Sequence, residues 1–341
     1  MDTGKFPGKA RFLYFLSQVQ IILDKAATSE NPALLVYTEN MRTPLFMLEA
    51  LTRLYKNIHN HHKFSKLNDV FKEIEDRLGS IDYYDGFHKG LISQKRMPEA
   101  LTGYMQKQMN KKVKELDQEL KKEKWIGKHK KGISKIIEKI DKADWLEMKE
   151  DTNAILETYR GYINGIIEKY KVAHLKFEDI ESDVHELRRE LRWLSIYPQA
   201  LVGIMQLKTD NDPQDFLKKY LTPEIINSPY NIMPDENKLQ DYMHNRPDGD
   251  RKTNHILLNN HYFYALSWMI AELGKLKDSG LKIKALEESL ASVYKISKDA
   301  ESLAYCISDE NQLRIPEILT QSQKIAQTFF DENILENIIS Q

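Results

Sequence analysis

The stretch that decides the fold runs from His185 to Leu194 and reads HELRRELRWL. Its apolar residues recur every three or four positions, which is the spacing of an amphipathic helix: Leu187, Leu191 and Leu194. His185, Arg188 and Arg192 follow the same period, so they form one row on the surface of that helix. The cationic row therefore borders the buried seam of the helix instead of lying opposite to it.

A second stretch, residues 39–48, reads ENMRTPLFML and matches the first in its apolar positions and its first arginine. The corresponding pairs are Met41 and Leu187, Arg42 and Arg188, Leu45 and Leu191, and Leu48 and Leu194. Each stretch precedes a Leu-Gly pair, at Gly79 and at Gly274, which we interpret as a helix end followed by acidic residues. A repeated helical unit with an insertion in its second copy explains this pattern.

The paired motifs resemble the CHAD family, the conserved-histidine α-helical domains. The resemblance lies in His-x-x-Arg-x-x-x-Arg on a helix, followed by Leu-Gly-x-x-x-Asp, and it covers about residues 30–310. It places His185, Arg188 and Arg192 on the His-Arg-Arg positions of the family and Asp278 on its acidic position. It implies two pseudo-symmetric four-helix bundles whose basic helices line a central groove or pore that binds inorganic polyphosphate.

The first copy departs from the family pattern, so the chain resembles a divergent member. Glu39 stands where the family has His, Phe46 stands where it has Arg, and only Arg42 remains. The resemblance places Asp85 on one acidic position of the family in this copy. These departures bear more on polyphosphate binding than on the fold.

The sequence predicts an all-α chain that forms a single unit over residues 1–341. We expect a first bundle repeat at 30–170, a second at 171–310 and a C-terminal helix at 311–341. The second repeat contains an insertion at about 209–253, which we expect to be irregular, to contain short helices and to lie outside the bundle core, because prolines and Asp or Asn residues favour turns. The prolines of the insertion are Pro213, Pro223, Pro229, Pro234 and Pro247.

Proline, glycine and capping residues set the expected helix boundaries. Pro32 opens a helix that Pro44 should kink, and Gly79 should end the next one, which starts at about Leu67. Ser182 is the expected cap of the helix that carries the cationic row and ends before Pro198. The remaining expected helices span 10–26, two within 98–142 separated by Gly127 and Gly132, 151–171, 281–297, 299–307 and 315–339.

Composition excludes several classes of protein. Lys+Arg 50 and Asp+Glu 51 nearly cancel, so overall charge indicates neither a nucleic-acid binder nor a binder of acidic ligands. One cysteine, Cys306, excludes an intrachain disulfide and a multi-cysteine zinc site, and it favours a reducing, cytoplasmic location. No stretch has the ~20 apolar residues of a membrane span. Phosphate-binding, dinucleotide and nucleophile-elbow motifs are absent, so we expect no enzyme, no cofactor and no metal site.

The candidate polyphosphate-binding residues are the cations in and near the two motifs. They are Arg42, His185, Arg188, Arg189, Arg192, Lys275 and Lys277. Arginine suits phosphate because its planar fork offers paired donors. The competing interpretation is that these arginines pair with carboxylates of adjacent helices, with Asp278 as one partner, and that Glu186 or Glu190 satisfies Arg189.

Residues 105–142 are also basic, with 13 Lys against 6 Asp or Glu. A basic amphipathic helix can bind a membrane surface or an acidic polymer. The alternative, which we favour, is a bundle helix with a solvated lysine face. Aromatic residues are sparse here, so nucleic acid is not an expected partner.

The pattern therefore predicts a non-enzymatic domain that binds inorganic polyphosphate or another polyanion. The alternative is a helical scaffold or protein-interaction protein in which the anion groove has decayed. A third, weaker hypothesis is a helical enzyme that acts on a small phosphorylated substrate.

Overall fold

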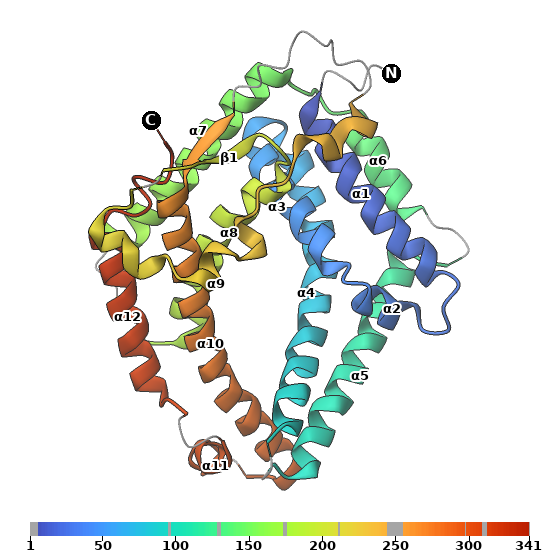
Figure 1. Ribbon diagram of the computed structural model, residues 1–341. Helices are drawn as coiled ribbons and strands as arrows, with labels where there is room; N and C mark the ends of the chain where they lie inside the picture. Colours follow the sequence, from blue (N-terminus) through green and yellow to red (C-terminus); the bar gives the residue numbers. More distant parts are fainter. Residues whose placement is uncertain are drawn as a thin grey trace.

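The computed structural model describes residues 6–94, 97–127, 131–172, 176–210, 212–243, 255–296, 298–308 and 312–340 (Figure 1). It is built almost entirely of helices, so the predicted all-α class is confirmed. The α-helices are α1 (Pro7–Ala26), α2 (Pro32–Thr38), α3 (Arg42–Ile58), α4 (His61–Ile92), α5 (Glu99–Lys122), α6 (Gly132–Asp141), α7 (Met148–Ile167), α8 (Glu186–Ala200), α9 (Pro223–Ile226), α10 (Asn260–Tyr294), α11 (Ala300–Ile307) and α12 (Ile315–Asp331).

Short elements complete the chain. They are the π-helical turns η2 (Glu168–Val172) and η3 (Ile180–His185), the 3-10 segments η4 (Asp215–Tyr220), η5 (Pro229–Asn231) and η6 (Glu236–Tyr242), and the strands β1 (Met205–Lys208) and β2 (Ile256–Asn259). The two strands pair in parallel and form the whole sheet within the described residues. No helix in the described ranges is long and apolar enough to cross a membrane.

Two long helices, α4 and α10, form the sides of the molecule and converge at its lower end in Figure 1. Each long helix carries a shorter one: α3 packs on α4, and α8 packs on α10. The short helices α3 and α8 also pack on each other, which joins the two sides at the upper end. The chain thus encloses a central space between α4 and α10.

The helices α3, α4, α8 and α10 form a ring around this space, and apolar packing closes the ring at both ends. The main core lies at the α3–α8 end, where Leu45, Leu48 and their counterparts Leu191 and Leu194 are fully buried. A smaller core, separate from the first, joins the ends of α4 and α5 to α10 and α11. There the hydroxyls of Tyr84 and Tyr104 both donate to the same oxygen of Glu288, at 3.0 and 2.8 Å.

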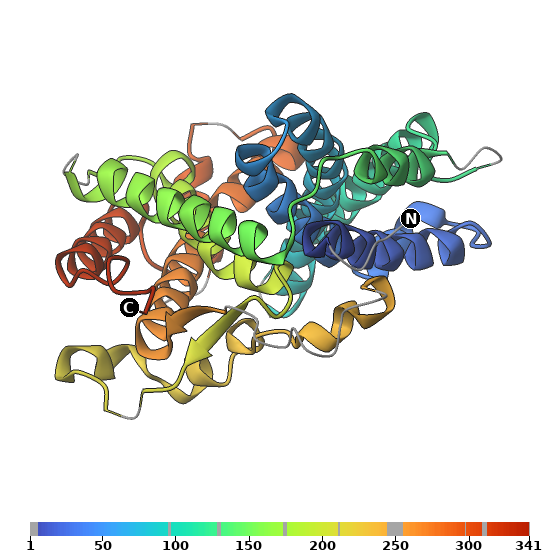
Figure 2. The same ribbon diagram turned by 90° about the horizontal axis from the view of Figure 1, so that it is seen from above.

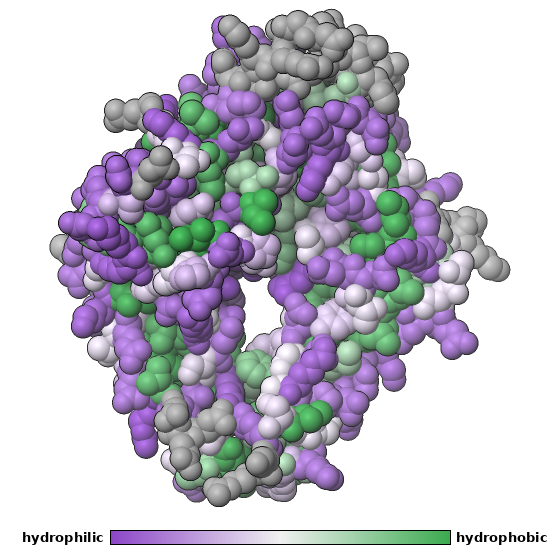
Figure 3. Space-filling model, viewed as in Figure 1, coloured by the Kyte–Doolittle hydropathy of each residue, from purple (hydrophilic) through white to green (hydrophobic). Residues whose placement is uncertain are grey.

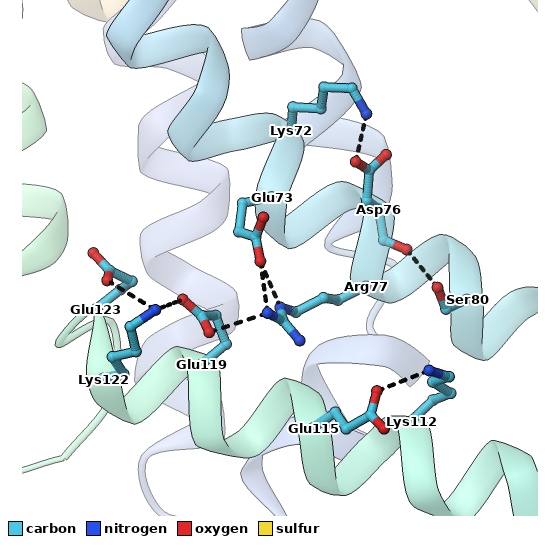
Figure 4. Close-up of polar contacts among 10 residues, drawn as sticks. All are labelled: Lys72, Glu73, Asp76, Arg77, Ser80, Lys112, Glu115, Glu119, Lys122 and Glu123. Atoms are coloured by element: carbon cyan, nitrogen blue, oxygen red, sulfur yellow. Dashed lines mark hydrogen bonds and ion pairs between the residues drawn. The ribbon is translucent and has the colours of Figure 1, made fainter.

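Ion pairs fix α5 along the outer side of α4 (Figure 4). Arg77 of α4 pairs with Glu73 one turn earlier and with Glu119 of α5, at 2.6 and 3.1 Å. Lys122 donates to the same Glu119 at 2.9 Å, so this carboxylate, of which 9% is exposed, is fully paired. The basic character of α5 is therefore partly neutralised where the helix meets α4.

The glycines of both Leu-Gly pairs lie in the middle of long helices, so the predicted helix ends there are wrong. α4 continues from Gly79 to Ile92, and α10 continues from Gly274 to Tyr294. The reason is local packing: a Cβ atom on either glycine would come within 2.9 Å of an arginine guanidinium, that of Arg42 or Arg188. Glycine serves here for close approach and not for a left-handed helix end.

Other boundaries also differ from the prediction. The helix expected to kink at Pro44 is instead two helices, α2 and α3, because the helical conformation is interrupted at residues 39–41. Pro44 lies in the first turn of α3, where a proline costs no hydrogen bond. The predicted cap, Ser182, is wrong. The capping residue is Asp179 at the start of η3, the turn that leads into α8, and its side chain accepts hydrogen bonds from the backbone N–H groups of Glu181 and Ser182. α8 continues through Pro198 to Ala200. Gly127, with φ +98°, does separate α5 from α6 as expected.

The described part of the insertion at 209–253 has short helices and no long ones, as expected, and it runs along one side of the molecule (Figure 2). It does not lie wholly outside the core. Leu217, Tyr220 and Leu239 are almost fully buried and belong to the main core. Pro247 lies outside the described residues.

The local contacts of α3 and α8 correspond, since each places its arginine over a glycine of its long helix. This agrees with an internal repeat. The arrangement of two complete four-helix bundles related by pseudo-symmetry stays a prediction.

A buried polar cluster ties four elements of the upper end together. Arg11 of α1 donates to Asp151 of α7 and to the hydroxyl of Tyr55 of α3, each at 2.7 Å, and to the carbonyl of Leu201 at 2.8 Å. The Tyr55 hydroxyl in turn donates to Asp151 at 2.8 Å. The side chains of Arg11 and Asp151 are 1% and 0% exposed, so the charges depend on each other for compensation.

Replacing Asp151 should therefore destabilise the fold strongly. We expect Asp151→Ala to lower the free energy of unfolding by about 3–5 kcal/mol, because it leaves Arg11 charged and buried without a counter-ion. Asp76→Ala, which breaks the exposed pair of Asp76 with Lys72 on α4 (Figure 4), should cost at most ~1 kcal/mol. Urea unfolding of both variants measures the difference, and equal losses would contradict the role given to Asp151.

Candidate functional site

The central space is a cavity of about 1980 Å³. Its walls come from α4, from η3 and α8, from the segment 222–230 and from α10, with the end of α11 at its lower side. Figure 3 shows that it opens through the molecule, because the background is visible between the two sides. The cavity is therefore a passage and not a closed pocket.

Arg188 lies on the wall formed by α8, over Gly274 of α10. Its Nε donates to the backbone carbonyl of Ile270 at 3.1 Å. Within the described residues no carboxylate lies within ion-pair distance of it, and Asp278, the expected partner, pairs with Lys277 at 2.7 Å. Burial lowers the pKa of Arg188 from its usual value, and the charge of Asp278 only partly opposes this.

Arg42 occupies the corresponding place over Gly79 but is neutralised. It pairs with Glu75 at 2.7 Å and with Asp82. Burial acts against its charge, but these two carboxylates outweigh burial and raise the pKa of Arg42. Pairing within the fold, the competing interpretation of the sequence, thus describes Arg42.

Two substitutions explain why the second copy differs. Glu75 lies four residues before Gly79, and Asp82 lies three residues after it. The same offsets from Gly274 lead to Ile270 and Lys277. Arg188 has therefore lost both carboxylate acceptors of its counterpart, and a backbone carbonyl replaces only one of them.

Arg192 lies one helical turn beyond Arg188 on the same wall. Its guanidinium stacks on the ring of Phe46 from α3, 4.5 Å from the ring centre. It makes no hydrogen bond or ion pair within the described residues, and burial together with the charges of Arg188 and Arg42 lowers its pKa. Arg188 and Arg192 are thus two neighbouring positive charges that face the cavity, and neither forms an ion pair with a residue that the structure describes.

The remaining predicted residues are less available. His185 lines the cavity, but its Nδ1 lies 2.7 Å from Glu181. Lys275 and Lys277 also line it, and they pair with Glu272 at 2.6 Å and with Asp278. Arg189 does not line the cavity, since it is exposed and pairs with Glu186 at 2.5 Å.

The charge of the lining is nearly balanced overall. Six Arg or Lys side chains and five carboxylates line the cavity. Three of those carboxylates, Asp82, Glu272 and Asp278, pair with an Arg or Lys of the lining, and Glu181 contacts His185. Arg188 and Arg192 differ from Arg42, Lys275 and Lys277 of the lining, because neither has a carboxylate within ion-pair distance among the described residues.

The sequence analysis missed the wall supplied by the insertion. Tyr230 lines the cavity and is 58% exposed, and its segment η5 packs on α8, the helix that carries Arg188 and Arg192. Gln199 of α8 holds this segment by donating to the carbonyls of Tyr230 and Ile232, each at 3.0 Å. The sequence around Tyr230 indicates only a turn, because Ser, Pro and Asn favour turns whatever lies next to them.

The basic segment 105–142 lies away from these arginines, on α5 and α6, and residues 128–130 lie outside the described residues. On α5, Lys107 and Lys111 are exposed and make no ion pair with any described residue.

The described residues contain no group of His, Cys, Asp or Glu that could hold a metal ion, and His59 stacks on Tyr55. The lining of the cavity could bind an anion at Arg188 and Arg192 on α8.

No protein-family model, curated protein or solved structure matches this chain. The CHAD resemblance seen in the sequence therefore stays a prediction.

The two kinds of arginine should respond differently to replacement. Arg42→Met should lower the free energy of unfolding by about 2 kcal/mol, because it leaves the buried Glu75 without its partner. Arg192→Met should leave it within about 0.5 kcal/mol of wild type, because the lost contact with Phe46 is offset by relief of repulsion. Chemical denaturation of both variants gives the values. A loss at Arg192 as large as that at Arg42 would identify Arg192 as a structural residue.

Proposed function

We propose that this chain binds inorganic polyphosphate in its central cavity, as a non-enzymatic, divergent protein of the CHAD kind. The observation that carries the proposal is the pair Arg188 and Arg192, which face the cavity without a carboxylate partner among the described residues. Two guanidinium groups one turn apart can donate paired hydrogen bonds to phosphate oxygens. A phosphate there would also compensate two charges that burial disfavours.

The shape of the cavity supports a linear ligand. It passes through the molecule, so a chain longer than the passage can enter it and leave on the other side (Figure 3). A closed pocket would exclude such a chain by its length. The passage therefore favours a polymer over a compact metabolite.

A scaffold without an anion ligand is the second proposal, and one observation favours it. Arg42, Lys275 and Lys277 are all paired, which leaves much of the lining neutral. In that case α3 and α8 would hold the ring together and the cavity would have no ligand. A cytoplasmic location and the lack of an enzymatic activity belong to both proposals.

A titration of the purified protein with long-chain polyphosphate tests the first proposal. We expect binding at low salt that weakens as salt rises, because ionic contacts are screened over a Debye length of ~10 Å at 0.1 M. The double variant Arg188→Gln, Arg192→Gln should lose about 100-fold in affinity, since each charge-assisted contact contributes about 1.5 kcal/mol. Isothermal titration calorimetry at two salt concentrations gives both results.

A matched control comes from α5. Lys107→Gln, Lys111→Gln removes the same number of charges from an exposed face away from the cavity. We expect this variant to bind within about 3-fold of wild type, because exposed lysines contribute little individually. Equal losses in the two double variants would mean that binding is diffuse, and no binding by wild type would leave the scaffold.

A further inference from the structure

The unpaired cations are gathered at one place in the passage. Arg188 and Arg192 lie on consecutive turns of α8, while the other predicted cations of the lining pair with carboxylates at short distance. A polymer that bound along its length would need a cation for each of its charges as it crossed the cavity. The lining offers a polymer the two unpaired charges of Arg188 and Arg192, whereas Arg42, Lys275 and Lys277 are already paired with carboxylates. This distribution suits a single anionic group.

Tyr230 gives this place a third donor. Its ring lies on the cavity wall, and its hydroxyl makes no hydrogen bond within the described residues. The backbone beneath it is held firmly, by Gln199 and by the buried Asn231, which donates to Ile225 at 2.6 Å and accepts from Ser267 at 2.5 Å. Because η5 packs on α8, this phenol and the two guanidinium groups line the cavity from adjoining elements and supply three donor side chains.

We propose that this cluster recognises the terminal phosphoryl group of a polyphosphate chain, with Arg188, Arg192 and the hydroxyl of Tyr230 as its donors. The inference rests on the proposed function and specifies which part of the polymer the site holds. The chain end sits against α8 and the segment 228–231, and the following phosphates extend through the passage past the paired side chains.

The chemistry of the two kinds of phosphate explains the preference. A terminal phosphoryl group has three free oxygens and approaches two negative charges above pH ~6, as other phosphate monoesters do. An internal phosphate has two free oxygens and one charge. Three donor side chains with two positive charges therefore match the charge of a chain end, whereas an internal unit leaves one positive charge uncompensated.

Linear and cyclic phosphates separate end recognition from recognition along the chain. Tripolyphosphate and trimetaphosphate each contain three phosphorus atoms, but the ring has no terminal group. We expect the linear compound to bind wild type at least ~10-fold more tightly than the ring, which is the effect of losing one charge-assisted contact. Equal affinity for the two compounds would overturn the inference.

The number of protein molecules bound to each chain gives an independent result. With polyphosphate of about 100 units, we expect saturation at no more than two protein molecules per chain, one at each end, whatever the length. Recognition along the chain would instead give a number that rises with length. Light scattering or sedimentation of mixtures at low salt measures this, and a rising number would overturn end recognition while it retained polyphosphate binding.

Tyr230→Phe tests the third donor. It should weaken tripolyphosphate binding about 10-fold, because it removes one hydrogen bond to a charged group. Tyr230 is 58% exposed, so its replacement should leave the fold intact. Tyr294→Phe is the control, since Tyr294 is 46% exposed and does not line the cavity, and it should bind as wild type does. Unchanged binding in Tyr230→Phe would remove the phenol from the site, and failure of wild type to bind any polyphosphate would instead refute the proposed function.

Discussion

The seating of an arginine on a helical glycine is the contact on which the architecture depends. It lets α8 approach α10, and α3 approach α4, closely enough for the leucines beside the arginine to pack in the main core. It also directs each guanidinium toward the space between the long helices. What that guanidinium meets is then decided by two positions of the long helix. Glu75 and Asp82 neutralise Arg42, whereas Ile270 and Lys277 leave Arg188 without an ion pair among the described residues.

The helices around the passage must be held in place by contacts elsewhere, because side chains that line a void lack packing contacts on that side. Here the walls are fixed at both ends. The main core joins α3 to α8, and the smaller core joins α4 and α5 to α10 and α11. The shared acceptor Glu288 of α10 connects this helix to α4 and α5 at the lower end. The two apolar cores thus fix α4 and α10 relative to each other at both ends, so the space between them stays open without side chains that fill it.

Helical periodicity was enough to predict the all-α fold and the helices at both motifs. Of the seven candidate binding residues, all but Arg189 line the cavity, and whether they bind a ligand stays a prediction. The periodicity failed at Gly79, Gly274 and Pro198, because glycine either ends a helix or admits a neighbour, and the sequence of one helix does not show its neighbour. It could not show which arginine is neutralised, since that depends on residues about 30 to 90 positions away that only packing brings near. The wall containing Tyr230 was missed for the same reason, because a turn signature indicates a loop and not what the loop covers.

Phe46 shows how the difference between the two motifs favours an unpaired Arg192. It occupies the position that corresponds to Arg192, and its ring lies under the guanidinium of Arg192 at 4.5 Å and under that of Arg42 at 5.1 Å. An arginine at position 46 would add a third uncompensated charge beside two that already repel each other. An aromatic ring instead stabilises a neighbouring cation by its quadrupole while it adds no charge. Phe46 therefore makes the unpaired state of Arg192 less costly than an arginine at position 46 would, so the difference between the two motifs favours the cationic site on α8.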